Sequence, residues 1–115
     1  MSEETGQIHI DFQEEDIKNS SRKGDLAEFY AVTWLWDNGY EVFLNAGCTG
    51  PIDMIAFKDG KTILIDVKTV ILDPRFPNAI KSKNSSRTAG QKELGVVILN
   101  FDSDTRKLRW VDHRQ

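Results

Sequence analysis

Residues 52–68 read IDMIAFKDGKTILIDVK, two β-branched, apolar runs on either side of an Asp-Gly dipeptide at positions 59 and 60. Asp-Gly is among the pairs that best accept the positive φ angles of a type I′ turn, so this stretch predicts a β-hairpin. Pairing Lys58 with Lys61 across the turn aligns the apolar residues of the two strands and sets Ile55 opposite Leu64. We therefore expect a hairpin with this register.

The same register places Asp53 directly opposite Asp66. Two carboxylates that face each other on neighbouring strands, with Cβ atoms roughly 5 Å apart, repel and destabilise the sheet. We therefore expect a divalent cation to bridge them. Lys68 shares the face of Asp66, because side chains two residues apart on a strand point the same way. The alternative is that Asp66 and Lys68 form an ordinary ion pair along one strand and that Asp53 is a polar residue near the turn.

The composition is typical of one soluble globular domain, with 115 residues, 39% of them hydrophobic and 29% charged. A chain of this length buries one core but not two. The single cysteine, Cys48, excludes an internal disulfide, and His9 and His113 lie too far apart for a zinc site. A metal bound here is expected to be a hard ion on oxygen ligands.

Residues 1–19 form an acidic arm, which precedes a single domain over residues 20–115. The first 16 residues hold six acids and no Lys or Arg, and Ile8, Ile10 and Phe12 alternate with polar residues as in a short strand. No apolar run approaches the length of a membrane span, and the acidic start differs from the basic start of a signal peptide. We expect a soluble, cytoplasmic protein without a membrane partner.

The net charge of −3 conceals a mildly basic body, because the six acids of the arm leave 15 bases and 12 acids in residues 17–115. A basic loop is expected over residues 74–92, which contain five bases and no acid. One interpretation is a solvated, mobile loop. Beside a metal site, the same loop becomes a candidate surface for binding phosphates.

The remaining elements follow from periodicity and turn residues. A helix is predicted over residues 22–38, with Asn19, Ser20 or Ser21 as N-cap and Gly39 after its end. Further strands are predicted over residues 40–45, 95–101 and 107–112, and a short helix over 88–94. Together with the hairpin, these elements predict an α/β fold with a central mixed β-sheet of four to five strands flanked by helices.

Glu28 supplies a third carboxylate from the predicted helix. It shares a largely apolar stripe with Ala31, Val32 and Leu35, which follow it by three, four and seven residues. A charge that projects from such a stripe is costly without a partner. The alternative is that Glu28 lies at the edge of the stripe and reaches water, but the expected carboxylate pair favours a place beside that pair.

The helix also carries more aromatic surface than a small sheet can cover. Trp34 and Trp36 lie two residues apart and cannot share a face, so we expect one in the core and the other against a second subunit. Phe29 and Tyr30 add to the same surplus. This pattern predicts a homodimer.

A series of short motifs spans residues 22–70: Lys23-Gly24, Glu28, Asn38-Gly39-Tyr40, Gly50-Pro51-Ile52-Asp53 and Asp66-Val67-Lys68. In this order they resemble the PD-(D/E)XK nuclease superfamily, most of all its archaeal Holliday-junction resolvases. Homing and restriction endonucleases of the superfamily have a similar layout. The resemblance implies a restriction-endonuclease-like core and Mg²⁺-dependent hydrolysis of DNA phosphodiester bonds, with Mn²⁺ able to substitute.

The resemblance also implies roles for individual residues. Asp53 and Asp66 would bind the metal, the Val67 backbone carbonyl would be a further ligand, and Glu28 would complete the shell. Lys68 would serve the attacking water. The candidate catalytic residues are thus Glu28, Asp53, Asp66 and Lys68. This chemistry is coherent by itself, because a carboxylate-held Mg²⁺ stabilises the extra negative charge of phosphodiester hydrolysis and acidifies a bound water.

Three departures from the resolvase pattern bear on the substrate. Phe29 stands where many resolvases have an arginine after the helical glutamate, residues 48–50 keep only part of a Ser-Gly-like loop, and the predicted helix after the catalytic strand is short. Gln91 falls where some related nucleases keep a helical glutamine near the site. The residues expected to contact DNA are the bases Lys23, Arg75, Lys81, Lys83, Arg87 and Lys92.

We therefore expect a metal-dependent DNA endonuclease that is structure-selective in the manner of the resolvases, with DNA, branched DNA included, as its partner. One alternative is a sequence-specific nuclease of the homing or restriction type, although 115 residues leave little room for a separate recognition domain. Another alternative is a nuclease-fold module that binds nucleic acid without cutting it. The presence of all four candidate catalytic residues argues against that second alternative.

Overall fold

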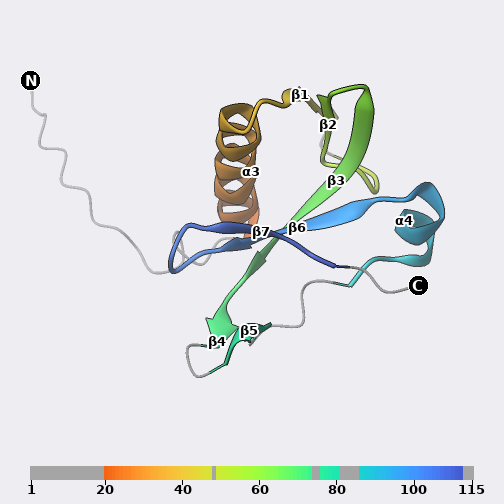
Figure 1. Cartoon of the computed structure of the whole chain (residues 1–115). Coiled ribbons are helices and arrows are strands. Elements are labelled where there is room, and N and C mark those ends of the chain that lie inside the picture. The colour runs from red at the N-terminus through yellow and green to blue at the C-terminus, as the bar shows by residue number, and fades with distance from the viewer. Residues whose placement is uncertain (1–19, 48, 74–75, 81–85, 113–115) are drawn as a thin grey trace, which may run out of the picture.

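The structure is a computed structural model that describes residues 20–47, 49–73, 76–80 and 86–112 (Figure 1). The acidic arm and the strand expected within it lie outside these residues, as do the DNA-binding candidates Arg75, Lys81 and Lys83. In the described part of the chain, no helix is both long enough and apolar enough to cross a membrane.

Helix α3 spans Ser20–Asp37 and begins two residues before the predicted start. Two residues after its end lies Gly39, whose φ of 89° is in the left-handed region that glycine adopts without strain. The Tyr40 N–H then donates to the Leu35 carbonyl at 3.0 Å and reverses the chain. The predicted helix and its glycine stop are confirmed.

The predicted hairpin and its register are confirmed by strands β2 (Met54–Lys58) and β3 (Lys61–Val70). The antiparallel pairs include Lys58 with Lys61, Phe57 with Thr62 and Ile55 with Leu64. Asp59 and Gly60 have φ angles of 53° and 76°. Two successive positive φ angles are those of a type I′ turn, whose twist matches that of the flanking strands.

The sheet contains five strands in the order β1-β2-β3-β6-β7. Strand β1 spans Glu41–Leu44, β6 spans Val97–Asp102 and β7 spans Leu108–Trp110. All neighbours are antiparallel except β3 and β6, which run parallel. The predicted α/β fold with a mixed sheet is therefore confirmed.

Helix α3 covers one face of this sheet (Figure 1). The core cluster beneath it consists of Ala31, Leu35, Met54, Ala56, Ile65 and Leu99. Each large apolar side chain buried in this way contributes about 1.5–3 kcal/mol. Successive side chains of a strand point to opposite faces. Asp66 and Asn100, which follow the core residues Ile65 and Leu99, therefore lie on the face away from α3.

The two helix tryptophans have different surroundings, as the sequence predicted. The Trp34 ring packs 5.7 Å from the Trp110 ring, between centroids, against strand β7. Trp36 is 66% exposed. The sheet therefore covers only one side of α3.

The prediction of one continuous basic loop over residues 74–92 is wrong. Strand β5 (Phe76–Ile80) pairs with β4 (Leu72–Asp73) in a second, two-stranded sheet, and helix α4 spans Ala89–Leu94. Pro77 is compatible with this strand, because proline is tolerated in an edge strand and both strands of a two-stranded sheet are edges. The predicted short helix at 88–94 is confirmed.

Candidate functional site

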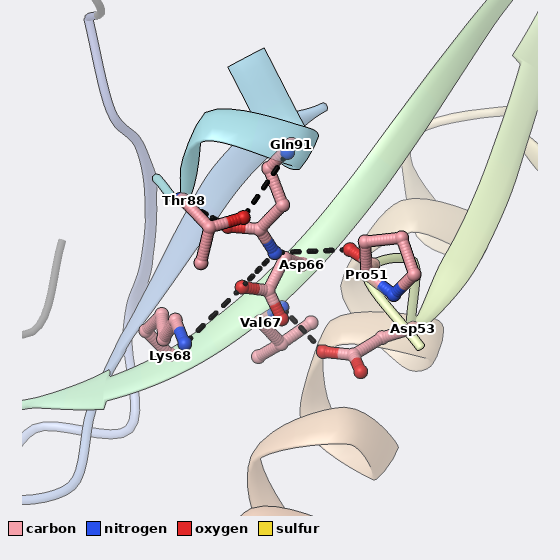
Figure 2. Close-up of polar contacts among 7 residues, drawn as sticks. All are labelled: Pro51, Asp53, Asp66, Val67, Lys68, Thr88 and Gln91. Atoms are coloured by element: carbon pink, nitrogen blue, oxygen red, sulfur yellow. Dashed lines mark hydrogen bonds and ion pairs between the residues drawn. The ribbon is translucent and has the colours of Figure 1, made fainter. Parts of the chain in front are cut away.

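The site forms where β2 stops pairing with β3 and β3 continues alone on that side. The last β2 pair is Met54 with Ile65, and the preceding Asp53 N–H still donates to the Ile65 carbonyl at 2.8 Å. Asp53 Oδ2 then accepts the Val67 N–H at 2.7 Å (Figure 2). The Asp53 carboxylate thus takes the place of a strand partner and is held against β3.

Asp66 lies beside Asp53 and is 7% exposed. Its Oδ2 receives two donors, the Lys68 ammonium at 3.3 Å and the Gln91 side-chain amide at 2.9 Å (Figure 2). The strand ion pair that the sequence left as an alternative is therefore present. The same alternative expected Asp53 to be a polar residue near the turn. The Asp53 carboxylate instead lies beside Asp66, where it accepts the Val67 N–H.

Gln91 connects three parts of the site from helix α4. Its side-chain oxygen accepts the Thr88 N–H at 2.9 Å while the Thr88 hydroxyl accepts the Gln91 N–H at 3.1 Å, so the two residues form a capping box. Its amide nitrogen donates to Asp66 and also to the Pro51 carbonyl at 3.0 Å. Gln91 therefore fixes the orientation of Asp66 relative to the loop that carries Asp53.

Asp66 is close enough to Asp53 to change the ionisation of Asp53. Burial raises the pKa of Asp53 from 3.8 to about 7, and hydrogen bonding to Asp66 and its negative charge act in the same direction. The Val67 N–H lowers the pKa, because it favours the charged form, but does not offset the burial. Burial and the neighbouring carboxylate therefore move the pKa of Asp53 into the neutral range.

Glu28 lies on α3 near this pair and is half-buried. Burial raises its pKa, and the charges of Asp25 and Asp66 raise it further. The influence of Asp66 shows that Glu28 belongs to the same electrostatic field. Glu28 was expected either beside the carboxylate pair or at the edge of the apolar stripe, in contact with water. Its half-buried position agrees with both alternatives.

The donor set is suited to a hard divalent cation. Among the described residues, no three Asp, Glu, His or Cys side chains form a group that could hold a metal ion by themselves. Mg²⁺ does not need such a group, since it keeps several waters and is commonly held by one or two carboxylates. Asp53 and Asp66 meet that requirement, and a cation between them would offset the repulsion that helps to raise the pKa of Asp53.

The bases predicted to bind DNA are spread over several elements. Lys23 on α3 and Lys92 on α4 are exposed. Arg87 is half-buried and donates to the Val96 carbonyl at 3.2 Å, so it ties the start of α4 to its end. Arg87 thus has a structural contact that the sequence did not indicate.

The place of Gln91 at the start of α4 could have been recognised from the sequence, because Thr88-x-x-Gln91 matches the capping-box pattern.

The chain was also compared with known proteins. No protein-family model matches it. Among curated proteins, no sequence relative was found. Among solved structures, the bacterial homing endonuclease I-Ssp6803I is similar, with a TM-score of 0.59 and 14% sequence identity. The match covers 81% of this chain but only 65% of that chain. At this identity the similarity shows a shared fold.

The ionisation of Asp53 predicts how the metal-free protein responds to pH. Asp53 ionises at 3.8 in the unfolded chain but keeps its proton to about pH 7 in the folded chain. Between these values the folded state binds more protons, so this group's contribution to the free energy of unfolding falls as the pH rises. Asp53→Asn removes the titration. In EDTA, the variant's stability relative to wild type should grow from about pH 4 to pH 7 and then level off.

Urea denaturation of wild type and Asp53→Asn across this pH range measures the difference directly. Subtracting one curve from the other cancels the other acids, which titrate in both proteins. A difference that stays constant with pH would show that Asp53 is not perturbed by its surroundings.

Proposed function

We propose that this chain is a metal-dependent DNA endonuclease that hydrolyses phosphodiester bonds. The observation that carries the proposal is the meeting of Asp53, Asp66 and Lys68 on one side of β3, with one carboxylate fixed by the backbone and the other by Gln91. The shared fold with a solved homing endonuclease supports it. A purely structural ion pair of Asp66 and Lys68 would not require a second, half-buried carboxylate beside it.

The proposed metal is Mg²⁺, with Mn²⁺ able to substitute. Asp53 and Asp66 would hold it, together with the Val67 carbonyl and with Glu28 completing the shell. When bound, the ion would supply charge stabilisation for the phosphorane-like transition state and a water acidified for attack. Gln91 keeps Asp66 in place for this purpose through the 2.9 Å hydrogen bond to its Oδ2.

Lys68 has a separate role in this proposal. Its ammonium is 3.3 Å from Asp66 Oδ2 and its side chain is about one-third exposed, so it can reach both the carboxylate pair and a substrate. There it would orient or deprotonate the attacking water, or neutralise the charge that develops on the phosphate. Either action makes it a catalytic group and not a ligand.

The proposal also concerns the class of DNA that is cleaved. The motif order favours structure-selective cleavage in the manner of a Holliday-junction resolvase, whereas the solved neighbour is a homing endonuclease, which favours sequence-specific cleavage. A cleavage assay with four-way junction, flap, single-stranded and linear duplex DNA in Mg²⁺ or Mn²⁺ separates the two. Selective cutting of branched DNA supports the first, and cutting of one linear sequence supports the second. Binding of DNA without cleavage would contradict the nuclease proposal and would indicate a non-catalytic nucleic-acid-binding module.

A homodimer is proposed as the active form. Leu26, Phe29 and Trp36 are 37%, 70% and 66% exposed, and their spacing of three and seven residues places them along one outer stripe of α3. A second copy of the chain would cover this stripe and present two sites to two DNA strands. Sedimentation at micromolar concentration should give about twice the 13.1 kDa monomer mass. Trp36→Glu should restore the monomer.

A wild-type protein that sediments as a monomer both alone and on DNA would contradict the dimer. It would favour a nicking enzyme over a resolvase. Asp37→Asn, which also changes the charge by one unit on the same exposed turn, serves as the matched control for Trp36→Glu.

A further inference from the structure

A buried amide without partners lies beside the candidate site. Asn100 is in the middle of β6 and is 1% exposed. Within the described part of the chain, neither its amide nitrogen nor its amide oxygen has a hydrogen-bond partner. Buried amides are nearly always hydrogen-bonded, and an unsatisfied one destabilises the fold. The presence of an amide at this position therefore calls for an explanation other than stability.

The position of Asn100 connects it to the catalytic face. It pairs with Lys68 on β3 and with Arg109 on β7 (Figure 1 shows the three strands). Paired residues of neighbouring strands point to the same face, and the strands lie roughly 4.8 Å apart. Asn100 is thus next to Lys68, on the same face of the sheet as Asp66, and Arg109 follows one strand further on.

A pocket opens on this part of the sheet. Its volume is about 210 Å³, and its lining consists of Val70, Asn100, Asp102, Thr105, Lys107 and Arg109. A water in the liquid occupies about 30 Å³, so the pocket has room for a ligand of several heavy atoms. The Asp102 carboxylate is engaged within its own turn, where it accepts the Asp104 N–H at 3.0 Å and the Thr105 hydroxyl at 2.9 Å. Lys107 and Arg109 carry two positive charges against the one negative charge of Asp102, so the lining has a net positive charge.

The chemistry of the lining identifies a ligand class. The phosphodiester group of DNA by itself offers only acceptors and would leave the Asn100 amide oxygen unsatisfied. The edge of a nucleobase carries a donor beside an acceptor and can pair with both groups of an asparagine amide. The two cations suit the phosphate that accompanies such a base. A nucleotide therefore satisfies the amide and the charges together.

We propose that this pocket receives a single unpaired nucleotide of DNA next to the scissile phosphate, with its base on Asn100 and its phosphate on Lys107 and Arg109. A base that is paired inside a duplex cannot enter a pocket, whereas an unpaired base costs little to extrude. The inference rests on the proposed nuclease function and narrows its substrate to DNA with an unpaired base at the cut site.

Binding to two matched DNAs tests this inference. One is a perfect duplex and the other carries one additional, unpaired adenine. In EDTA, where no cutting is expected, wild type should bind the second DNA about tenfold more tightly by fluorescence anisotropy. Asn100→Leu should bind both DNAs equally. Lys107→Ala combined with Arg109→Ala should weaken binding to the DNA with the unpaired base, whereas Lys61→Ala on the distant hairpin turn should not.

Leucine has the same number of side-chain heavy atoms as asparagine in the same branched arrangement and has no polar group to satisfy, so Asn100→Leu should remain folded and raise Tm by about 5 °C. If it does not fold, the double variant of Lys107 and Arg109 carries the test. Equal wild-type affinity for the two DNAs, or a preference that survives in Asn100→Leu, would overturn the pocket assignment and leave the amide to an ordered water.

The pocket assignment and the proposed nuclease function can be contradicted independently of each other. A protein that cuts DNA but ignores the unpaired base retains the proposed function and loses the pocket. A protein that binds the unpaired base through Asn100 but cuts no DNA retains the pocket and loses the nuclease. A protein that binds neither DNA overturns the pocket assignment as well.

Discussion

Asp66→Asn should abolish DNA cleavage, with a loss of at least about 10³-fold in the single-turnover rate, while the fold stays intact. The variant keeps an oxygen that can accept the Gln91 amide, so the contact between α4 and β3 survives. It lacks the charge needed to hold the cation. Asp53→Asn should have the same effect on cleavage, because its amide oxygen can still accept the Val67 N–H.

The matched control is Asp59→Asn. Asp59 lies in the hairpin turn with a φ of 53°, a conformation that asparagine tolerates, so this change removes a carboxylate without altering the turn. Its cleavage rate should equal that of wild type. Circular dichroism and urea denaturation establish that the site variants are folded. Wild-type cleavage by either folded site variant would mean that the carboxylate pair does not hold the metal.

Lys68→Ala should lose about 10²–10⁴-fold in the cleavage rate, the range for removal of a general acid or base, yet retain metal binding. The reason is that Lys68 contacts Asp66 but offers no lone pair to a cation while it is an ammonium. Calorimetric titration with Mn²⁺ measures the binding, and single-turnover cleavage measures the rate. Loss of the ammonium should leave the Mn²⁺ affinity equal or higher.

Lys61→Ala, at the start of the same strand and exposed, is the control for loss of a lysine from β3. A Lys68→Ala protein that cuts at the wild-type rate would reduce Lys68 to the structural partner of Asp66. If metal binding disappears together with the rate, Lys68 instead holds the carboxylates in position.

The hairpin could be predicted from the sequence because its determinants are local. The Asp-Gly turn and the pairing of Lys58 with Lys61 fix the register over five residues of each strand, and the opposition of Asp53 and Asp66 follows from that register. The helix was predictable for the same reason, from its apolar spacing and the glycine after it. Elements defined by their own residues and the next turn need no tertiary information.

The contacts around the site depend on distant segments and were less predictable. Gln91 reaches Asp66 across 25 residues, and nothing in the local pattern gives that distance. The register of β3 and β6 is parallel, so no turn fixes it, and the placement of Asn100 beside Lys68 could not be derived. Strand β5 could not be predicted, because Pro77 argues against a central strand and only the fold shows that this strand lies at an edge.

The most direct measurement of the central claim is a Mg²⁺ titration of DNA cleavage by wild type, beside an Asp66→Asn preparation purified in the same way. The proposed site predicts no product in EDTA, a rate that rises with Mg²⁺ until it saturates, and no product from Asp66→Asn at any concentration. Cleavage in EDTA, equal cleavage by the variant, or no wild-type cleavage of any DNA in Mg²⁺ or Mn²⁺ would contradict a metal-dependent nuclease centred on Asp53 and Asp66.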